Sequence, residues 1–314
     1  MESTANPERT KNSALRLLIS GGSGMLGSAL RVALTRRAAE IIQLVRREPA
    51  SREELRWDPA AASPVSAPHA LRGLDAAIHL SGANLAARRW TPQYVHEITA
   101  SRVDSTRALA LMLARMKPPP HSLLAASAVG IYGDRGEEIL DESSSPGSGF
   151  LADLCRAWEA AADPAMEAGI RVVHLRFGVV LDRHAGALAQ ILPIFRLGLG
   201  GKLGPGNQWM SWISLPDLVA SMLFVLDTPS LSGPVNLASP QPVTNDEFTQ
   251  ALARSLRRPA VLPAPSFALR IVLGRMADEA LLASTRVIPR KLLQAGFLFA
   301  HPSIQAALAA AMER

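Results

Sequence analysis

Short apolar runs alternate with longer helical patterns through the first part of this chain. The apolar runs are uninterrupted rather than alternating, which is typical of parallel strands covered on both faces. They occur at 15–20, 41–45, 55–57, 76–80, 123–126 and 172–177. Helical patterns at 24–37, 91–116 and 149–169 separate them, and Pro92 stands where a first helical turn tolerates proline. This alternation predicts a doubly wound parallel α/β sheet.

The pattern changes after Leu181. A helical stretch and a glycine-rich loop fill 182–212, a helix is expected at 216–226, and a late strand at 235–237. Prolines then interrupt the helical segments that follow residue 240. We therefore expect a core domain from 14–182 plus 213–238, and a smaller, interleaved, mainly helical substrate lobe from 183–212 plus 239–314. Residues 1–13 are polar and predict a disordered tail.

Composition narrows the possible classes of protein. Of the 314 residues, 48% are hydrophobic, which is enough for a substantial core. The net charge is +6, but the arginines are spread along the chain, so an anionic small ligand is favoured over nucleic acid. The single cysteine, the absence of a signal-peptide pattern and the lack of a long apolar run predict a cytoplasmic protein without a membrane anchor. A monomer and a homodimer are equally compatible with the sequence.

A glycine triplet at the end of the first strand is the clearest functional signal. Gly21, Gly24 and Gly27 have GxxGxxG spacing between a strand and a helix. Such glycines permit a tight turn, close approach of backbone amides to a pyrophosphate, and close packing of helix on strand. The helix N-terminus adds free N–H groups and a partial positive charge. We therefore predict a Rossmann dinucleotide site that also uses Ser23, Met25 and Leu26.

The end of the second strand bears on which dinucleotide is bound. NAD sites usually carry Asp or Glu there for the ribose hydroxyls. This chain has Arg46 and Arg47 instead, and a guanidinium can fork onto a 2′-phosphate. The cofactor is therefore predicted to be NADP rather than NAD. The alternative is that both arginines are ordinary surface residues.

The sequence resembles the extended short-chain dehydrogenase/reductase superfamily. More closely, it resembles the atypical branch called epimerase family proteins, sometimes labelled cell-division inhibitor homologues. The motifs that carry this resemblance lie at 21–27, 57–59, 79–84, 89–91, 101–103, 127–134, 149–151, 158–159, 175–181, 200–204 and 209–213. A terminal module resembling that of the same branch runs from 265 to 302. The resemblance implies a Rossmann core with a substrate lobe over the carboxyl ends of its strands.

The resemblance also implies further cofactor contacts. Leu80, Ser81 and Gly82 are expected on the adenosine–ribose side, and Phe177, Gly178 and Val179 near the nicotinamide. Arg102 lies where the wider superfamily often has Asn. It is interpreted as a contact to a cofactor phosphate or an anionic substrate, with a surface salt bridge as the alternative.

The Tyr-x-x-x-Lys pair of typical short-chain dehydrogenases is missing. In those enzymes the tyrosine transfers a proton and the lysine lowers its pKa. Here Tyr94 and Tyr132 are the only tyrosines, and neither has Lys four residues later. On the expected helix the pair is replaced by Phe150 and Leu154, or by Leu151 and Cys155, depending on register. This departure puts the usual mechanism in doubt.

Two residues remain as catalytic candidates. Ser127 ends a strand and is predicted to orient a substrate oxygen, or else to bond the backbone. Tyr132 is the only tyrosine near the expected site, and it is predicted to act as an acid or, alternatively, to be a packing residue. Cys155 is expected to be an inert buried thiol. Carboxylates at 134–141 are interpreted as a solvated loop, with a catalytic base as the alternative. The tryptophans at 209 and 212 are interpreted as closing the lobe interface, with cover over a substrate as the alternative.

No metal site is expected, since the histidines lack ligand spacing and there are no cysteine pairs. We therefore predict an NADP-dependent oxidoreductase or epimerase that acts on a small substrate, for which an anionic group is one option. The alternative is a regulatory protein that binds NADP(H) and senses its redox state without turnover.

Overall fold

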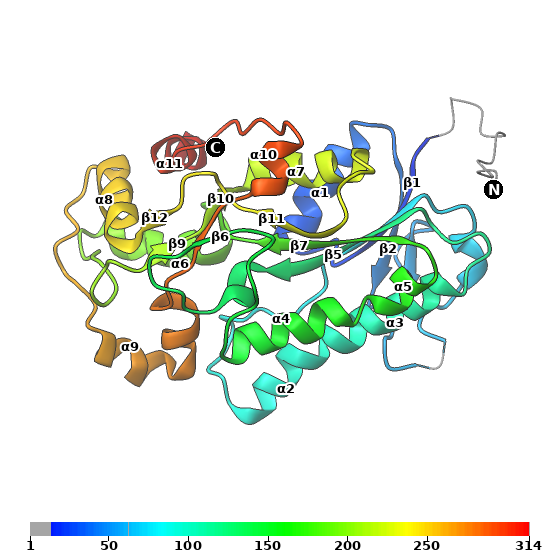
Figure 1. Ribbon diagram of the computed structural model, residues 1–314, viewed down its shortest axis with the longest axis horizontal. Coiled ribbons are helices and arrows are strands. Elements are labelled where there is room, and N and C mark those ends of the chain that lie inside the picture. Colours follow the sequence, from blue (N-terminus) through cyan, green and yellow to red (C-terminus); the bar gives the residue numbers. More distant parts are fainter. Residues whose placement is uncertain (1–13, 62, 314) are drawn as a thin grey trace.

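The computed structural model describes residues 14–61 and 63–313, so the tail predicted at 1–13 lies outside it. Its centre is a seven-stranded parallel sheet (Figure 1). In spatial order the strands are β3 (Glu54–Arg56), β2 (Glu40–Val45), β1 (Arg16–Ser20), β4 (Ala76–His79), β5 (Ser122–Ala128), β7 (Arg171–Phe177) and β11 (Gly233–Leu237). The order reverses beside β1, as in a doubly wound sheet. The predicted fold class is confirmed.

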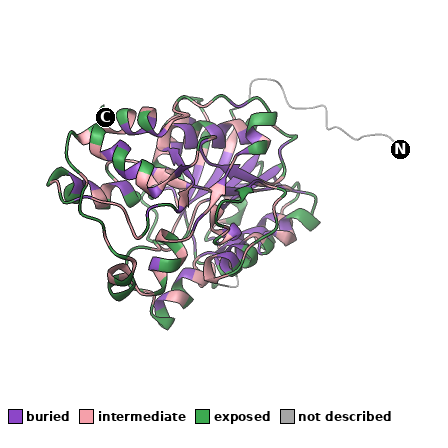
Figure 2. Cartoon of the chain, turned by 60° about the vertical axis from the view of Figure 1, so that its left-hand side comes forward, coloured by how far each residue is buried: buried purple, intermediate pink, exposed green. Residues whose placement is uncertain are grey.

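Helices cover both faces of this sheet and explain why its strands are apolar throughout. α1 (Met25–Thr35) and α7 (Leu215–Asp227) pack on one face, and α3 (Val103–Ala114), α4 (Phe150–Ala160) and α5 (Asp163–Glu167) on the other. Within β1, Leu17 and Ile19 join the first core and Leu18 the second, and all three are buried. Figure 2 shows the sheet buried between helices whose outer surfaces are exposed.

The helix predicted over 91–116 is two helices, α2 (Pro92–Ala100) and α3. The break lies at Ser101 and Arg102, whose side chains bind another segment of the chain. The Ser101 hydroxyl accepts from Ala83 N, and the Arg102 guanidinium donates to the Ala83 and Ile98 carbonyls. A tertiary contact therefore bends the chain at a point that the apolar pattern does not mark.

The helix predicted over 149–169 also divides, into α4 and α5. Pro164 is the second residue of α5. Proline has no N–H and restricts the residue before it, so it is tolerated in a first turn but not in a continuous helix.

A second lobe forms where the chain leaves the sheet and later returns to it. Its elements are β8 (Val179–Leu181), α6 (Gly186–Arg196), β9 (Trp209–Met210), β10 (Trp212–Ser214), β12 (Val243–Thr244), α8 (Asn245–Leu256) and α11 (Ile304–Glu313). They share a separate core around Trp212, which is fully buried and donates its indole N–H to Gln241 O at 3.0 Å. The division into two interleaved domains stays a proposal that this core supports.

The segment between α8 and α11 reaches back over the first domain. It contains α9 (Ser266–Leu273), the π-helical turn η3 (Ala277–Leu281), β13 (Arg286–Val287) and α10 (Arg290–Gln294). β13 pairs with β6 (Ile139–Leu140), and α10 lies beside β11. Two 3-10 turns, η1 (Pro68–Leu71) and η2 (Val129–Tyr132), are the other short helical elements of the described residues. Among the described residues, no helix is long and apolar enough to cross a membrane.

Candidate cofactor and active site

The glycine loop joins β1 to α1 in a conformation that side chains would prevent. Gly21 has φ +73°, and a Cβ there would lie 2.7 Å from the backbone of Leu80. A Cβ on Gly27 would lie 2.3 Å from the carbonyl oxygen of Gly21. These two glycines are therefore required by close packing of loop, helix and β4.

The loop presents its remaining residues to solvent at the start of α1. Ser23 and Gly24 are exposed, and Gly24 is the N-cap of the helix with no side-chain cap. The first N–H groups of α1 are thus left for an external acceptor. Met25 and Leu26 are partly buried in the first turn of the helix. The loop geometry suits a diphosphate.

The two arginines after β2 have different environments. Arg47 forms two hydrogen bonds with Glu54, at 2.6 and 2.8 Å, and these bonds lower the pKa of the Glu54 carboxyl. Arg46 is exposed, and within the described part of the chain no hydrogen bond or ion pair engages its side chain. Arg46 is therefore the freer of the two to bind a phosphate.

The other predicted cofactor residues lie at the same end of the sheet. Leu80–Gly82 follow β4 directly, and the backbone of Leu80 contacts Gly21. Phe177 ends β7. Gly178 N donates to Leu237 O in β11 at 3.0 Å, and Val179 N donates to Ser211 O in the second lobe at 2.8 Å. A Cβ on Gly178 would lie 2.9 Å from that same carbonyl oxygen. The carboxyl ends of β1, β4 and β7 thus surround one region, as dinucleotide binding requires.

Arg102 has an internal role in this structure. Its side chain is buried, and its guanidinium lies over the ring of Trp158 at 5.1 Å. It donates to Ala83 O at 2.9 Å and Ile98 O at 3.2 Å, and burial lowers its pKa. This geometry supports neither a surface salt bridge nor a free phosphate ligand. Its contact with a cofactor stays a prediction, and its evident role is to fix the loop that contains Gly82.

The register of α4 is defined by its packing. A Cβ on Gly130 would lie 3.4 Å from the Leu151 Cβ, and Cys155 packs against Ile131 in the turn η2 (Val129–Tyr132) after β5. Phe150 instead packs edge-on against Trp90, with ring centroids 5.2 Å apart. Leu151 and Cys155 therefore lie on the face of α4 toward η2, at the end of β5. Burial raises the pKa of the Cys155 thiol to about 12, so it is neither acid nor nucleophile at neutral pH.

Ser127 belongs to a buried polar network. Its hydroxyl donates to Glu159 at 2.7 Å, and Glu159 receives two bonds from Arg176, at 2.8 and 2.9 Å. Burial opposes the charge on Glu159, but the bonds and charge of Arg176 outweigh it, so the pKa of this carboxyl is lowered. Because Ser127 donates inward, its oxygen is left to accept a hydrogen bond.

Tyr132 lies deeper in the same network. Its side chain is fully buried, its hydroxyl donates to Asn236 at 2.8 Å, and it accepts from Arg176 at 2.9 Å. Burial raises its pKa. With both hydrogen-bonding functions engaged and no exposed surface, this geometry favours the packing role over acid catalysis.

The sequence analysis missed an acidic residue at the N-terminus of α4. Glu279, in η3, accepts from Phe150 N at 2.9 Å and Leu151 N at 3.1 Å. A Cβ on Gly149 would lie 2.9 Å from the same carboxylate. Arg275 donates to Glu279 at 3.2 Å and lies over the Phe150 ring. No local pattern marks Glu279, because its partners are about 130 positions away.

Basic residues also surround this end of α4. Arg88 is exposed over the Tyr94 ring, and a Cβ on Gly274 would lie 3.4 Å from Arg89 Nε. The loop that carries both arginines follows β4 and therefore lies at the carboxyl edge of the sheet. No carboxylate pairs with either arginine in the described residues. They are available to an anion at this edge.

The carboxylates that follow Tyr132 in the sequence are bonded to other parts of the protein. Glu137 accepts from the Trp209 indole N–H at 2.6 Å, Asp134 accepts from Ser284 N, and Asp141 pairs with Arg290 at 2.8 Å. Asp134, Glu137 and Glu138 are exposed, as expected of a solvated loop, and the loop also contacts the second lobe and the C-terminal segment. Among the described residues, no cluster of side chains suits a metal ion.

Comparison with known proteins shows which family this chain resembles. Residues 17–238 match the NAD dependent epimerase/dehydratase family, and residues 264–311 match a domain of unknown function. An epimerase family protein of Mycobacterium tuberculosis is 46% identical over 94% of this chain and 97% of its own length. The human epimerase family protein SDR39U1 is 36% identical over 94% of this chain and 98% of its own length.

Solved structures agree in fold. The structure of human SDR39U1 with NADPH has a TM-score of 0.87 and 34% identity, and the match covers 96% of this chain and 100% of that one. A Thermus thermophilus UDP-glucose 4-epimerase in complex with NAD has a TM-score of 0.72 at 22% identity, which shows the shared fold alone. These relatives confirm the resemblance to the extended short-chain dehydrogenase/reductases. The chain belongs to the NAD dependent epimerase/dehydratase family.

Proposed function

We propose that this protein binds NADP(H) and acts as an oxidoreductase or epimerase on a small anionic substrate. The observation that carries this proposal is the glycine loop. Its glycines let the loop pack closely beside β4, and Gly24, the N-cap of α1, has no side chain to cap the first N–H groups of the helix. Ser23, Gly24 and the first turn of α1 would hold the diphosphate, and the residues after β4 and β7 would flank the two nucleosides. The bound nicotinamide supplies or accepts a hydride.

The preference for NADP over NAD is proposed on two grounds. The end of β2 carries the unengaged Arg46 where a carboxylate would select the ribose hydroxyls of NAD. A relative with 34% identity was solved with NADPH. Arg47 is a weaker ligand in this proposal, because Glu54 already engages its guanidinium.

The anionic character of the substrate is proposed from Arg88, Arg89 and Arg275. All three lie around the N-terminus of α4, and only Arg275 has a carboxylate partner. Guanidinium groups bind carboxylates and phosphates through paired hydrogen bonds. A substrate with such a group at this edge of the sheet would reach the end of β5.

Proton transfer is proposed to use Ser127 as a positioning hydroxyl. Because its proton is directed at Glu159, its oxygen is suited to accept a hydrogen bond from a substrate hydroxyl. Glu159, held ionised by Arg176, would stabilise that orientation. Tyr132 and Cys155 are left out of this proposal because the Tyr132 hydroxyl already donates and accepts within the protein, and burial raises the pKa of the Cys155 thiol to about 12.

A second candidate is a protein that binds NADP(H) and responds to its redox state without turnover. It is favoured by Leu151 and Cys155, which fill the usual Tyr and Lys positions with groups that cannot transfer a proton. In this reading the C-terminal segment that contacts α4 through Glu279 would report the cofactor state to a partner.

One experiment separates the two. The protein is loaded with NADPH and offered aldehydes and ketones with and without an anionic group; in parallel it is loaded with NADP+ and offered the matching alcohols and nucleotide sugars, and nicotinamide absorbance is followed in both. Product analysis accompanies it, because an epimerase can return the hydride internally. Turnover of an anionic substrate, reduced at least tenfold in an R88Q/R89Q variant with unchanged NADPH affinity, supports the enzyme. Tight NADPH binding without product from any of the compounds tested supports the second candidate, a protein that senses the redox state of NADP(H).

A further inference from the structure

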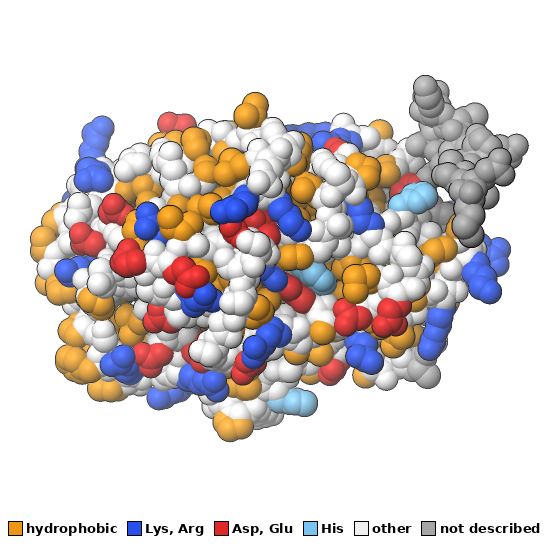
Figure 3. Space-filling view, viewed as in Figure 1, with side chains coloured by type: hydrophobic (Ala, Val, Ile, Leu, Met, Phe, Trp, Pro, Cys, Tyr) orange, Lys and Arg blue, Asp and Glu red, His pale blue; other side chains and the backbone are white. Residues whose placement is uncertain are grey.

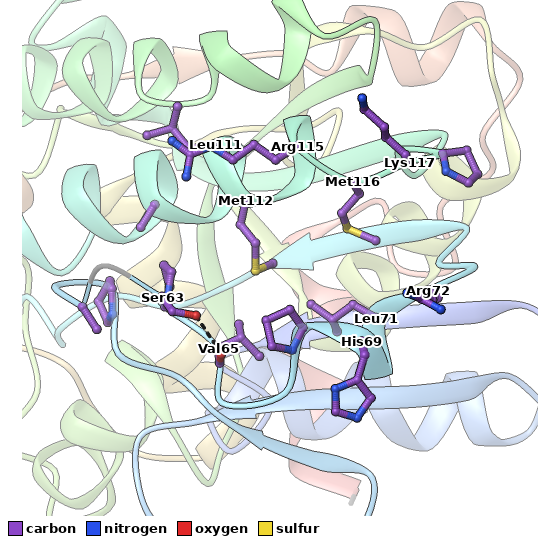
Figure 4. Close-up of a pocket in the computed structure, with 16 residues that line it drawn as sticks. Ser63, Val65, His69, Leu71, Arg72, Leu111, Met112, Arg115, Met116 and Lys117 are labelled. Carbon is purple, nitrogen blue, oxygen red and sulfur yellow. Dashed lines mark hydrogen bonds between the residues drawn. The ribbon is translucent and has the colours of Figure 1, made fainter.

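A cavity far from the glycine loop lies between α3 and the segment that connects β3 to β4. Its volume is about 750 Å³. Its upper wall is the C-terminal half of α3 and the four residues that follow it, and its lower wall includes the 3-10 turn η1 (Pro68–Leu71) (Figure 4). α3 leads into β5 and η1 leads into β4, so the cavity extends toward the amino ends of these strands. The glycine loop lies at their carboxyl ends, and none of its residues lines this cavity.

The floor of the cavity is apolar. Val65 and Leu71 are buried, with exposures of 2% and 1%, and both belong to the core beneath α3 and α5. Met112 and Met116 are partly buried and direct their thioethers into the space between the two walls (Figure 4). Methionine adapts its shape to irregular apolar ligands. This surface therefore suits a flexible hydrocarbon.

The rim of the cavity is basic. Arg72, Arg115 and Lys117 are exposed, His69 lies beside them, and the residues that line the cavity include no Asp or Glu. Within the described residues, none of these basic side chains forms a hydrogen bond or an ion pair. By contrast, many arginines elsewhere, such as Arg16 and Arg56, have a carboxylate partner. Neighbouring unpaired cations attract an anion to this cavity.

The composition of the lining argues against a nucleotide. Among the lining residues the only aromatic ring is that of His69, so a purine has little to stack on. The C-terminal half of α3 forms one wall and carries the negative end of the helix dipole, which disfavours any anion placed beside the backbone there, phosphate and carboxylate alike. The guanidinium and ammonium groups on long stems must therefore supply the anion contacts.

We infer that this cavity binds a free amphipathic carboxylate, a hydrocarbon chain that ends in a carboxyl group. The chain lies over Met112 and Met116, and the carboxylate lies at the rim near Arg115 and Lys117. The volume falls within the range of roughly 300–1,000 Å³ typical of small-molecule sites. This inference does not depend on the proposed reaction, because it concerns residues at the opposite end of the sheet.

The test uses 11-(dansylamino)undecanoic acid as the fluorescent probe. Dodecanoate, below its micelle concentration, is expected to displace it, while methyl dodecanoate and acetate displace it at least tenfold less well. The double variant R115Q/K117Q is expected to weaken binding at least tenfold, because the carboxylate loses its partners. Met112→Trp, which fills the floor, is expected to abolish binding.

Two controls keep the result interpretable. The variant R254Q/R258Q removes the same charge from exposed arginines outside the cavity and is expected to bind as wild type. NADPH affinity, measured for every variant, is expected to stay unchanged and to be unaffected by dodecanoate. The inference is overturned if the methyl ester competes equally, if NADPH displaces the probe, or if the cavity variants bind normally. Sedimentation with phosphatidylglycerol vesicles without binding of dodecanoate would likewise overturn it in favour of a membrane surface.

Discussion

At the scale of single residues, the glycine loop separates packing from ligand binding. A Cβ on Gly27 would lie 2.3 Å from Gly21 O, whereas a Cβ on Gly24 would meet that atom at 3.4 Å, with an ordinary φ of −73°. We expect Gly27→Ala to lower the free energy of unfolding by about 1–3 kcal/mol, the usual cost of overpacking. Gly24→Ala should retain wild-type stability but weaken NADPH binding. Urea unfolding measures the stability of each variant, and NADPH fluorescence measures cofactor binding. Equal stability of the two variants would contradict the close packing of Gly27 against Gly21.

Arg46 gives a second prediction at this scale. Arg46→Asp should weaken NADPH binding by at least tenfold, since a hydrogen bond to a charged group contributes about 1.5–3 kcal/mol. NADH binding should change little, because NADH has no 2′-phosphate. Arg47→Asp serves as the comparison and should have a smaller effect, since its guanidinium is shared with Glu54. Fluorescence titration with both cofactors measures these affinities, and equal losses for NADPH and NADH would refute the assignment.

What the sequence could predict about single residues depends on how far away their partners are. Gly24 and Gly27 meet neighbours within one strand–turn–helix unit, so the spacing of the three glycines was informative, although Gly21 also packs against Leu80. Tyr132 is bonded to Asn236, and Glu279 to the start of α4, across more than a hundred positions. No local pattern encodes such pairs, which is why Tyr132 could be proposed as an acid and Glu279 was missed.

At the scale of elements, the network of Ser127, Glu159 and Arg176 joins α4 to β5 and β7. Both charged side chains are largely buried, with exposures of 12% and 7%. Removing one partner of such a pair leaves an uncompensated charge, so Glu159→Ala should cost about 3–5 kcal/mol of stability. Glu167→Ala, an exposed change at the end of α5, should cost less than about 0.5 kcal/mol. Thermal and urea unfolding measure both, and a near-neutral Glu159→Ala would show that the pair contributes little.

Element boundaries show the same limit on prediction from sequence. The buried parallel strands were found within one or two residues, because their apolar runs are bounded by polar or glycine positions. The two long helices were not, because α2 and α3 separate where Arg102 turns back to Ala83, and α5 has a proline as its second residue. The first break follows from a tertiary contact that periodicity does not contain, whereas Pro164 was visible in the sequence as a signal for the second.

At the scale of the whole molecule, charge is distributed rather than concentrated. Figure 3 shows basic and acidic side chains interspersed over the face that it presents. Many of them form short-range pairs, as Arg37 does with Asp227 between α1 and α7. A net charge of +6 therefore does not produce the continuous basic stripe that nucleic-acid binding would require. Arginines without a carboxylate partner occur at the carboxyl edge of the sheet and at the cavity beside α3, and others, such as Arg254 and Arg258, lie elsewhere on the surface.

The stability of the whole molecule should fall in mildly acidic solution because of His79. This side chain is fully buried between β1 and α3, where Ser20 Oγ lies 2.5 Å from Nδ1 and Ser105 Oγ 3.1 Å from Nε2. Burial lowers its pKa from 6.5 to about 4, and no charged group contributes to the shift. Between these two values the unfolded chain binds the proton more readily than the folded one. The stabilisation is therefore present above pH 6.5 and is lost as the pH falls toward 4.

The free energy of unfolding should be lower by about 3 kcal/mol at pH 4 than at pH 7 because of this group. The loss is at most about 1.4 kcal/mol for each pH unit. Urea unfolding at pH 7, 6 and 5 measures it before most carboxylates titrate. His79→Asn removes the titrating group and should flatten this slope, although its stability at pH 7 will fall because the two serines lose a partner. His96→Asn, an exposed change on α2, should retain the wild-type slope. If wild type and His79→Asn lose stability in parallel between pH 7 and 5, the acid sensitivity arises elsewhere and the hydrogen-bonded position of His79 is purely structural.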